Sequence, residues 1–256
     1  MLKSGIRYLR CNVLKYVGKG SKKYCCICNK TVGGFLPYEI ECKSDIFTEL
    51  KIIGSDTKNF MCPRCKCNDR ERHLFLYATK LGLIDKFTNA KILHFAPERY
   101  ISQMISESKP LKYIKADLYP SSQDIQKIDM LSIPFEDNTF DFVIANHVLE
   151  HVNEVSTALK ELNRVLRVGG FAILQTPYSP VLYNTFSDPG ISSDSARLHL
   201  YGQEDHVRLF GRDIFEIIAN DGFKSSVSTH MEILSDIDAV RYGVNSLEPL
   251  FLFEKV

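Results

Sequence analysis

Two pairs of cysteines have the spacing of metal ligands. The pairs are Cys25 with Cys28 and Cys62 with Cys65, and each pair encloses two residues. Two thiolates in a Cys-x-x-Cys turn converge on one ion, and two such turns supply the four sulfur ligands of a tetrahedral zinc site. Because four thiolates leave no open coordination position, the spacing predicts a Zn²⁺ ion with a structural role.

The choice of ligands stays open, since other cysteines lie nearby. Cys26 and Cys67 adjoin the two turns, and Cys42 lies between them. All eight cysteines precede residue 68, so the chain divides into a cysteine-rich part and a longer part without cysteine. We predict a zinc ribbon over residues 25–68, with a strand near residues 35–40. The alternative is a set of buried thiols without a metal.

An acidic side chain ends a predicted strand in the second part of the chain. Asp117 stands at the carboxyl end of the segment 112–118. A carboxylate at that position of a parallel sheet can accept hydrogen bonds from both hydroxyls of a ribose. Asp117 therefore predicts a nucleoside-containing cofactor, either a nicotinamide dinucleotide or S-adenosylmethionine. The alternative is a surface carboxylate that caps the turn before Pro120.

The turn after the first predicted strand distinguishes between these two cofactors. Segment 91–96 is followed by Pro97 and Glu98, and no G-x-G-x-x-G sequence is present there. Glycines of that sequence let the backbone approach a pyrophosphate, so their absence argues against a dinucleotide. S-adenosylmethionine has no pyrophosphate and tolerates a different loop.

Strands that alternate with helices must position these side chains. Such alternation predicts an α/β domain with right-handed crossovers and a mostly parallel sheet, whose ligands bind at the carboxyl ends of the strands. The irregular segment 177–211 is long enough to cover that site. The predicted strands span residues 91–96, 112–118, 140–146, 171–176, 223–229 and 250–254, and the predicted helices span 69–83, 100–107, 155 to the Gly169-Gly170 pair, and 213–220.

Residues 129–176 resemble the second half of a class I S-adenosylmethionine-dependent methyltransferase of the type 11 family. This stretch begins with D-M-L-S-I-P-F and continues through H-V-L-E-H. The motifs C-P-R-C-K-C-N-D-R-E-R-H, H-F-A-P-E and G-Q-E-D-H-V-R-L-F-G-R-D resemble a subset of that family with an N-terminal zinc ribbon. The resemblance covers residues 62–230 and implies a Rossmann-like methyltransferase domain over residues 69–256.

The same resemblance implies which residues would contact S-adenosylmethionine. The loop of the first strand would line the methionine end of the cofactor, and Asn146 would face the same part. Asp129 would contact the adenine amine, and the backbone N–H of Met130 would reach a ring nitrogen. The loop of the first strand contributes His94, Ala96 and Glu98.

Histidines are the candidate catalytic residues. A hydroxyl or amine acceptor needs a base with a near-neutral pKa, which histidine provides. We predict His206, in segment 177–211, as that base, and His147 as a second candidate. The alternative for His206 is a hydrogen-bonded role in ordering its own loop.

The sequence H-V-L-E-H adds a metal hypothesis. On a helix, His147, Glu150 and His151 would share one face. Some RNA and quinone methyltransferases that the chain resembles place Glu and His at similar points to hold a divalent metal, although they have Glu where this chain has His147. The alternative is that these side chains frame the pocket by packing and capping.

Residues 1–24 contain basic residues and no acidic one. Their apolar residues recur at helical spacing, which predicts a basic amphipathic arm. Such a helix can lie on an anionic membrane surface or pack against a partner, and the alternative is a helix docked on its own domain.

Composition narrows the function classes. The 256 residues have a formal net charge of +1, which lacks the strong basic field of a nucleic-acid binder. No apolar run approaches the ~18 residues of a transmembrane helix. The first residues lack the apolar core of a signal peptide, so we expect a cytoplasmic protein, with peripheral membrane contact through residues 1–24 as an option. In that compartment cysteines favour metal binding over disulfides.

These observations together predict an S-adenosylmethionine-dependent methyltransferase with a structural zinc ion. The resemblance to a bacterial subset linked to surface-glycan synthesis implies a small molecule or a glycan precursor as acceptor. One alternative is an RNA methyltransferase that grips RNA with its ribbon and basic arm. Another is a non-catalytic scaffold that binds the cofactor and recruits a partner.

Overall fold

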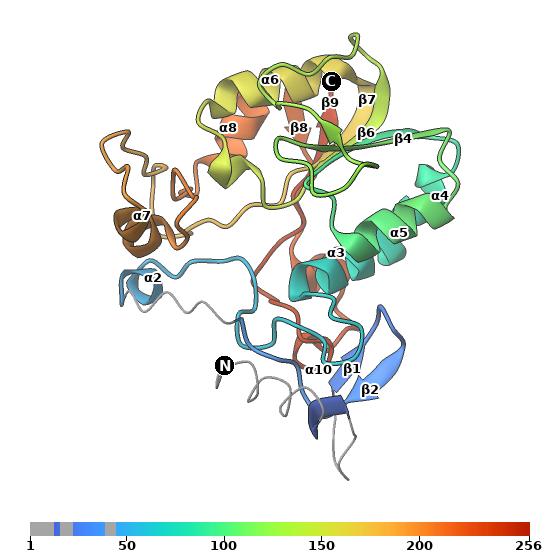
Figure 1. The fold of residues 1–256 in the computed structure, drawn as a ribbon, viewed down its shortest axis with the longest axis vertical. Coiled ribbons are helices and arrows are strands. Elements are labelled where there is room, and N and C mark those ends of the chain that lie inside the picture. Colours follow the sequence, from blue (N-terminus) through green and yellow to red (C-terminus); the bar gives the residue numbers. More distant parts are fainter. Residues whose placement is uncertain (1–12, 16–22, 39–44) are drawn as a thin grey trace.

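The computed structural model describes residues 13–15, 23–38 and 45–256. Most of the predicted basic arm, residues 1–24, lies outside the described residues, and so does Cys42. The described residues form a small antiparallel hairpin and a large α/β unit (Figure 1). The hairpin consists of β1 (Lys23–Cys25) and β2 (Lys30–Val32).

A seven-stranded sheet forms the centre of the α/β unit, with the strand order β5-β4-β3-β6-β7-β9-β8. Neighbouring strands are parallel, except that β9 runs antiparallel to β7 and β8. The mostly parallel sheet confirms the predicted Rossmann-like α/β class. The strands are β3 (Lys91–Phe95), β4 (Lys112–Asp117), β5 (Gln126–Lys127), β6 (Phe140–Ala145), β7 (Leu166–Ile173), β8 (Phe223–Ser225) and β9 (Leu252–Lys255).

Helices cover both faces of the sheet because successive strand residues point to opposite sides. Ile92 and Phe142 face one hydrophobic cluster with α3, α4 and α5, whereas Leu93 and Val143 face a second cluster with α6 and α8. The result is three layers, helix on sheet on helix (Figure 1). The helices are α3 (Asp69–Lys80), α4 (Leu83–Phe87), α5 (Arg99–Glu107), α6 (Val155–Val165) and α8 (Ile214–Asn220).

Shorter helices lie in the connections. A 3₁₀ turn at Leu149–His151 follows β6, and α7 (Asp194–Tyr201) lies within segment 177–211. The segment predicted to be irregular therefore contains a helix. The remaining short helices are α2 (Asp45–Glu49), α9 (His230–Ile233) and α10 (Ala239–Tyr242).

The helix predicted to run to the Gly169-Gly170 pair ends earlier. Helix α6 ends at Val165, and β7 begins at the next residue. A Cβ at Gly170 would lie 2.8 Å from the carbonyl oxygen of Arg167 and 3.0 Å from that of Asp141. The prediction of a helix stop was wrong because this glycine permits a close backbone approach beside β6.

Two other predicted elements differ in the structure. In place of the strand at residues 35–40, the described residues contribute only an isolated bridge between Leu36 and Met61. The helix predicted over residues 69–83 divides into α3 and α4 at Gly82, whose φ is 63°. A left-handed residue interrupts helical hydrogen bonding, and glycine adopts that conformation without steric cost.

The cysteine-rich segment packs on the α/β unit through Arg72 of α3. The Arg72 side chain is fully buried, and its guanidinium carbon lies 3.9 Å from the ring centroid of Phe35. The guanidinium donates hydrogen bonds to the carbonyl oxygens of Asn59, Tyr242 and Gly243. These bonds tie the segment before α3 to the C-terminal part of the chain. The division into residues 25–68 and 69–256 stays a prediction.

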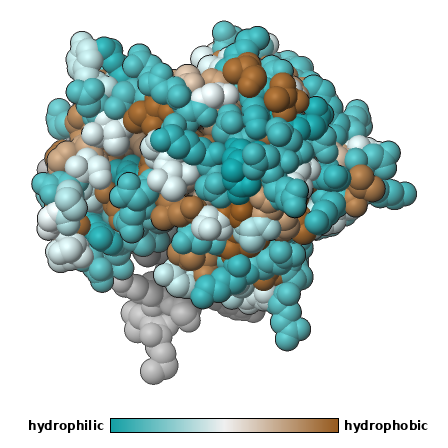
Figure 2. Space-filling view, turned by 90° about the horizontal axis from the view of Figure 1, so that it is seen from above, coloured by the Kyte–Doolittle hydropathy of each residue, from teal (hydrophilic) through white to brown (hydrophobic). Residues whose placement is uncertain are grey.

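Among the described residues, no helix is both long and apolar enough to cross a membrane. Figure 2 shows one face of the molecule, on which hydrophobic residues lie in small groups between hydrophilic ones.

Candidate functional site

The carboxyl ends of β3, β4 and β6 lie where the order of the sheet reverses. The chain proceeds from β3 through β4 to β5 on one side, and β6 begins the other side. Ligands of open α/β sheets bind at such a point. Glu98 follows β3, Asp117 ends β4 and Asn146 follows β6, so the structure brings these predicted cofactor residues to one edge.

Glu98 connects the loop of β3 with the end of β6. Its carboxylate accepts a hydrogen bond from the Asn146 side-chain amide, and its other oxygen lies 3.1 Å from Nε2 of His94. Burial by itself would raise the pKa of Glu98, but the hydrogen bond and the charge of His94 bring that pKa below its ordinary value. Glu98 is therefore an anion held in place at the cofactor edge.

His94 lies behind this carboxylate. Its side chain is fully buried, and Nδ1 lies 2.9 Å from the Tyr113 hydroxyl oxygen. Since the imidazole is enclosed between Tyr113 and Glu98, it would act on a bound cofactor through Glu98.

The loop between β3 and α5 turns sharply at Ala96. This residue has a φ of 45°, in the left-handed region that costs a non-glycine residue about 1–2 kcal/mol. Its N–H donates to the carbonyl oxygen of Ala116 in β4, at 2.9 Å. Strained backbone of this kind is concentrated at ligand sites, which agrees with the predicted role of the loop.

Asp117 and Asp129 lie at the ends of adjacent strands. Asp117 pairs in register with Lys127 of β5, two residues before Asp129. One carboxylate oxygen of Asp117 accepts from the Tyr119 N–H at 2.8 Å, and one of Asp129 accepts from the Leu131 N–H at 2.9 Å. Asp117 is half-buried and Asp129 is exposed. Both carboxylates are thus fixed by the backbone beyond their strands and keep access to a ligand.

Met130 lies between the exposed Asp129 and the core. Its side chain is buried in the cluster that also contains Ile128 and Ile133. This packing fixes the backbone whose N–H was predicted to reach the cofactor.

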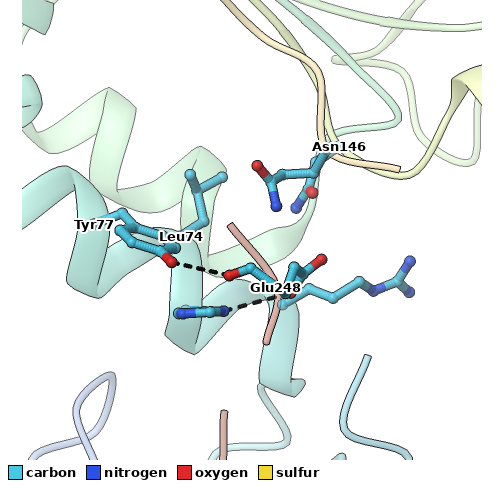
Figure 3. Close-up of a pocket in the computed structure, with 7 residues that line it drawn as sticks. Leu74, Tyr77, Asn146 and Glu248 are labelled. Atoms are coloured by element: carbon cyan, nitrogen blue, oxygen red, sulfur yellow. Dashed lines mark hydrogen bonds and ion pairs between the residues drawn. The ribbon is translucent and has the colours of Figure 1, made fainter. Parts of the chain in front are cut away.

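Asn146 also faces a small pocket between α3 and the sheet (Figure 3). Its side-chain oxygen is buried and has no hydrogen-bond partner among the described residues. Opposite it, Leu74 and Tyr77 of α3 and Glu248 line the pocket, and the Tyr77 hydroxyl donates to the Glu248 carbonyl oxygen at 2.9 Å. The pocket lies next to the predicted cofactor edge, and Asn146 belongs to both.

Glu248 is a buried anion between two histidines. One carboxylate oxygen lies 3.4 Å from Nδ1 of His73, and the other lies 3.4 Å from Nε2 of His147. The His147 contact is ionic, because it does not have hydrogen-bond geometry. Burial would raise the pKa of Glu248, but these histidines lower it.

Sequence reasoning missed this part of the site. Glu248 stands in the unremarkable sequence S-L-E-P-L, and His73 was assigned only to a connecting helix. The one available signal was the polar run D-R-E-R-H, which opens α3 with residues that an ordinary helix would expose. In the structure Asp69, Glu71 and Arg72 of this run are buried as well.

The helix that would place His147 and His151 on one face does not form. His147 has a φ of 57°, and only the short 3₁₀ turn follows it. The His147 N–H donates to the Gln175 carbonyl oxygen at 2.7 Å, which fixes this turn to the chain after β7. His147 consequently faces Glu248, while His151 lies 3.2 Å from the carboxylate of Asp205. The prediction of a shared helical face was wrong.

The two predicted catalytic histidines lie on either side of Glu150. His147 Nδ1 lies 3.4 Å from the Glu150 carboxylate, and His206 belongs to a group with Glu150 and His151. Burial opposes protonation of His147, but Glu150 and Glu248 raise its pKa. Burial lowers the pKa of His206, so this imidazole is neutral. A catalytic role for either stays a prediction.

Four thiols converge in the cysteine-rich segment. The Sγ atoms of Cys25, Cys62, Cys65 and Cys67 all lie within 4.8 Å of one another. Cys25 Sγ is 3.5 Å from Cys67 Sγ and 3.8 Å from Cys65 Sγ. A Zn–S bond of about 2.3 Å gives a tetrahedron with S–S edges of about 3.8 Å, so the donor set fits Zn²⁺.

This group differs from the predicted set by one residue. Cys67 takes part, whereas Cys28 lies partly buried against the same cluster. A tight turn brings Cys67 in, because the Cys62 N–H donates to the Cys67 carbonyl oxygen at 2.8 Å. Cys26 points elsewhere, toward the carbonyl oxygen of Arg72. Hydrogen bonding among these thiols lowers the pKa values of Cys62 and Cys65 and raises those of Cys25 and Cys67.

Residues 101–174 match a sequence model of a family described as a methyltransferase domain. The matched stretch runs from α5 to the end of β7 and contains β4, β5 and β6. Residues 101–174 of the α/β unit are thus similar to a methyltransferase domain.

Among curated proteins, a demethylmenaquinone methyltransferase of Staphylococcus aureus is 43% identical over 54 residues. These residues are 21% of this chain and 22% of that protein. The chain thus matches about a fifth of the length of its curated relatives.

Among solved structures, the YcgJ protein of Bacillus subtilis is similar to this chain with a TM-score of 0.46 and 16% sequence identity. The similarity covers 69% of this chain and 98% of that chain. An S-adenosylmethionine-dependent methyltransferase of Mesorhizobium loti has a TM-score of 0.46, 11% identity, and coverage of 69% and 96%.

Proposed function

We propose that this chain is an S-adenosylmethionine-dependent methyltransferase. The observation that carries the proposal is the overlap between the matched residues 101–174 and the strand ends that hold Asp117, Asp129 and Asn146. Polar side chains at these strand ends are what a nucleoside cofactor requires.

Different residues would contact the ribose, the adenine and the methionine part of the cofactor. Asp117 accepts hydrogen bonds from the ribose hydroxyls, because its carboxylate is half-buried at the end of β4. Asp129 and the Met130 backbone contact the adenine. Glu98 and Asn146 face the methionine end, where the anionic Glu98 complements a positively charged ammonium or sulfonium group.

Methyl transfer is an in-line displacement at a carbon that the sulfonium already activates. The protein's main contribution is alignment of the acceptor atom, the methyl group and the sulfur. Where the acceptor is a hydroxyl or an amine, a neutral imidazole can take its proton, and buried His206 meets that requirement.

The acceptor is a small molecule or a glycan precursor. The resemblance of the cysteine-rich motifs supports this acceptor class, whereas the pocket at Asn146 does not bear on it, because that pocket is small and is lined by both Arg70 and the anionic Glu248. The net charge of +1 also favours this acceptor class over RNA.

Calorimetry with S-adenosylhomocysteine tests the proposal. We expect the zinc-loaded chain to bind this product with one site, and a chain that shows no binding would sink the proposal. Methyl transfer from labelled S-adenosylmethionine to a panel of glycan and small-molecule acceptors is the second measurement. Binding without transfer to any acceptor would favour the scaffold alternative.

The thiol group is proposed to hold a structural Zn²⁺ ion. Cys25, Cys62, Cys65 and Cys67 would be its ligands, and the ion would cross-link the two ends of the segment. We expect Cys67→Ser to weaken zinc retention more than Cys28→Ser, as measured by release to a colorimetric chelator. The reverse order would return Cys28 to the ligand set.

A further inference from the structure

We propose that Glu150, His151 and His206 form a second metal site, which binds one divalent transition-metal ion. One ligand atom from each residue lies within 4.8 Å of the other two. Two imidazoles and one carboxylate suit Zn²⁺, Fe²⁺, Co²⁺ and Mn²⁺, in contrast to the all-sulfur set of the cysteines.

His206 presents an unpaired nitrogen to this group. The residue is 3% exposed, and Nδ1 lies 3.0 Å from the Tyr201 carbonyl oxygen. A carbonyl oxygen only accepts, so Nδ1 carries the proton and Nε2 carries the lone pair. Nε2 is buried and has no hydrogen-bond partner among the described residues. Leaving a buried acceptor unsatisfied is unfavourable, and a coordinated ion would satisfy it.

His151 is oriented in the same way. Its Nδ1 lies 3.3 Å from the Asp205 carbonyl oxygen and 3.2 Å from the Asp205 carboxylate. Both partners accept a hydrogen, so the lone pair is again on Nε2. The His151 side chain is 31% exposed and its ring centroid lies 4.7 Å from that of His206. An ion can therefore reach the group from solvent beside His151.

Glu150 supplies the negative charge. It is 1% exposed, and its carboxylate accepts a hydrogen bond from the Thr176 hydroxyl at 2.9 Å. Its other carboxylate oxygen lies 3.4 Å from Nδ1 of His147. The carboxylate is thus oriented by a neighbouring hydroxyl and an imidazole, as metal-binding carboxylates are.

The surrounding backbone holds the ligands together without an ion. The Val207 N–H donates to the Glu150 carbonyl oxygen at 3.0 Å. Arg208, largely buried, donates to the carbonyl oxygens of Val152 and Asn153. Residues 206–208 are therefore fastened to residues 149–153, and the metal would bind a group that is already assembled.

Three protein ligands leave coordination positions open, as in catalytic metal sites. The group follows β6 and contacts Thr176 after β7, at the same edge as Asn146. If the proposed methyltransferase function holds, an open position would bind an oxygen of the methyl acceptor and lower the pKa of a hydroxyl there. A metal-bound His206 has no free lone pair, so in the metal-loaded chain the ion, and not His206, would prepare the acceptor for methylation. This last step rests on the proposed function, whereas metal binding itself does not.

Cobalt titration of the metal-free full chain tests the site. We expect two equivalents of Co²⁺ to bind. The thiolate equivalent gives an intense sulfur-to-metal charge-transfer band, and the Glu150 equivalent gives only weak visible bands. His206→Gln and His151→Gln should each remove the weak equivalent, with a loss of affinity above the ~10–100-fold typical of outer-shell changes. The matched control is His199→Gln, because His199 is exposed on α7 and outside the group.

The inference would be overturned if the wild-type chain bound only one equivalent of Co²⁺, the one that gives the intense charge-transfer band. It would also be overturned if the His206→Gln and His151→Gln variants each still bound two equivalents of Co²⁺. Circular dichroism identifies a variant that fails to fold, and the partly exposed His151 keeps the test valid if His206→Gln does so. Cobalt binding in a chain that does not bind S-adenosylhomocysteine would preserve the metal site and refute only the proposed function.

Discussion

Glu98 illustrates how a single residue can organise the candidate cofactor edge. Its carboxylate accepts a hydrogen bond from the Asn146 amide, which follows β6, and also contacts the His94 imidazole of β3. A carboxylate that is already hydrogen-bonded needs little rearrangement when a cationic ligand arrives, and this preorganisation favours binding. The loop H-F-A-P-E thereby holds a charged side chain in place at the candidate cofactor edge.

Asp117→Ala is expected to weaken binding of S-adenosylhomocysteine about tenfold or more, since charge-assisted hydrogen bonds contribute about 1.5–3 kcal/mol. Isothermal calorimetry measures the change. Asp124→Ala is the control, because Asp124 is an exposed carboxylate beyond the same strand that pairs with Lys115. Equal effects of the two substitutions would remove Asp117 from the site.

Glu98→Gln is expected to change the pH dependence of stability. The folded-state pKa of Glu98 lies below its ordinary value, so its ionised form stabilises the folded chain above the unfolded pKa of about 4.3. That contribution is lost as the pH falls through the lower folded-state pKa. Urea unfolding should therefore show wild type more stable than Glu98→Gln at neutral pH, with the difference shrinking in acid.

Glu107→Gln serves as the control for this pH series, since Glu107 is exposed on α5. A constant difference between wild type and Glu98→Gln at every pH would contradict the assignment of an ionised Glu98.

At the scale of elements, the sharpest departure from expectation lies at the start of β7. The periodicity of α6 continues through Leu166, but the strand begins there because its residues pair with Phe140 of β6. Pairing with a neighbouring strand outweighed the local helical pattern, as tertiary context commonly does.

Gly170→Ala is expected to destabilise the chain by about 1–3 kcal/mol, the usual cost of overpacking. The added Cβ would lie 2.8 Å from a backbone oxygen, which cannot move aside as a side chain can. Urea unfolding provides the measurement. Gly190→Ala is the control, because its Cβ would meet the side chain of Asp188. Equal stability of both variants would contradict the close backbone approach at Gly170.

At the scale of the whole molecule, α3 links the cysteine group to the cofactor edge. Glu71 of α3 accepts from the Tyr100 N–H at 2.8 Å, and the Tyr100 hydroxyl donates to the carbonyl oxygen of Cys65. Tyr100 is the second residue of α5, which begins directly after Glu98. These hydrogen bonds connect the cysteine group with the loop that carries Glu98.

Removal of zinc by a chelator is expected to lower the unfolding temperature and to weaken S-adenosylhomocysteine binding. Tyr100→Phe should keep the zinc and lose part of that affinity, because it removes the bond to Cys65 alone. Differential scanning fluorimetry and calorimetry measure the two effects, with Tyr24→Phe as control, because the Tyr24 hydroxyl donates to Asn29 within the hairpin. Unchanged affinity in the zinc-free chain would mean that the two regions are independent.

Features that depend on near neighbours in the chain were predictable from the sequence alone. Alternating apolar segments predicted the strands and helices of the parallel sheet, and Asp117 was recognised from its place at a strand end. Cysteine spacing likewise indicated a metal group, because a Cys-x-x-Cys turn is a local structure. These signals extend over only a few residues, so they can be interpreted without knowledge of the fold.

Contacts between distant side chains became visible in the folded structure. It placed Cys67 in the thiol group, set Glu248 against His73 and His147, and brought His206 to Glu150 and His151. Each group joins segments far apart in the chain, and its geometry depends on packing and on left-handed residues such as His147. A local pattern carries no information on such contacts, because the free energy that selects them comes from burial across the whole core.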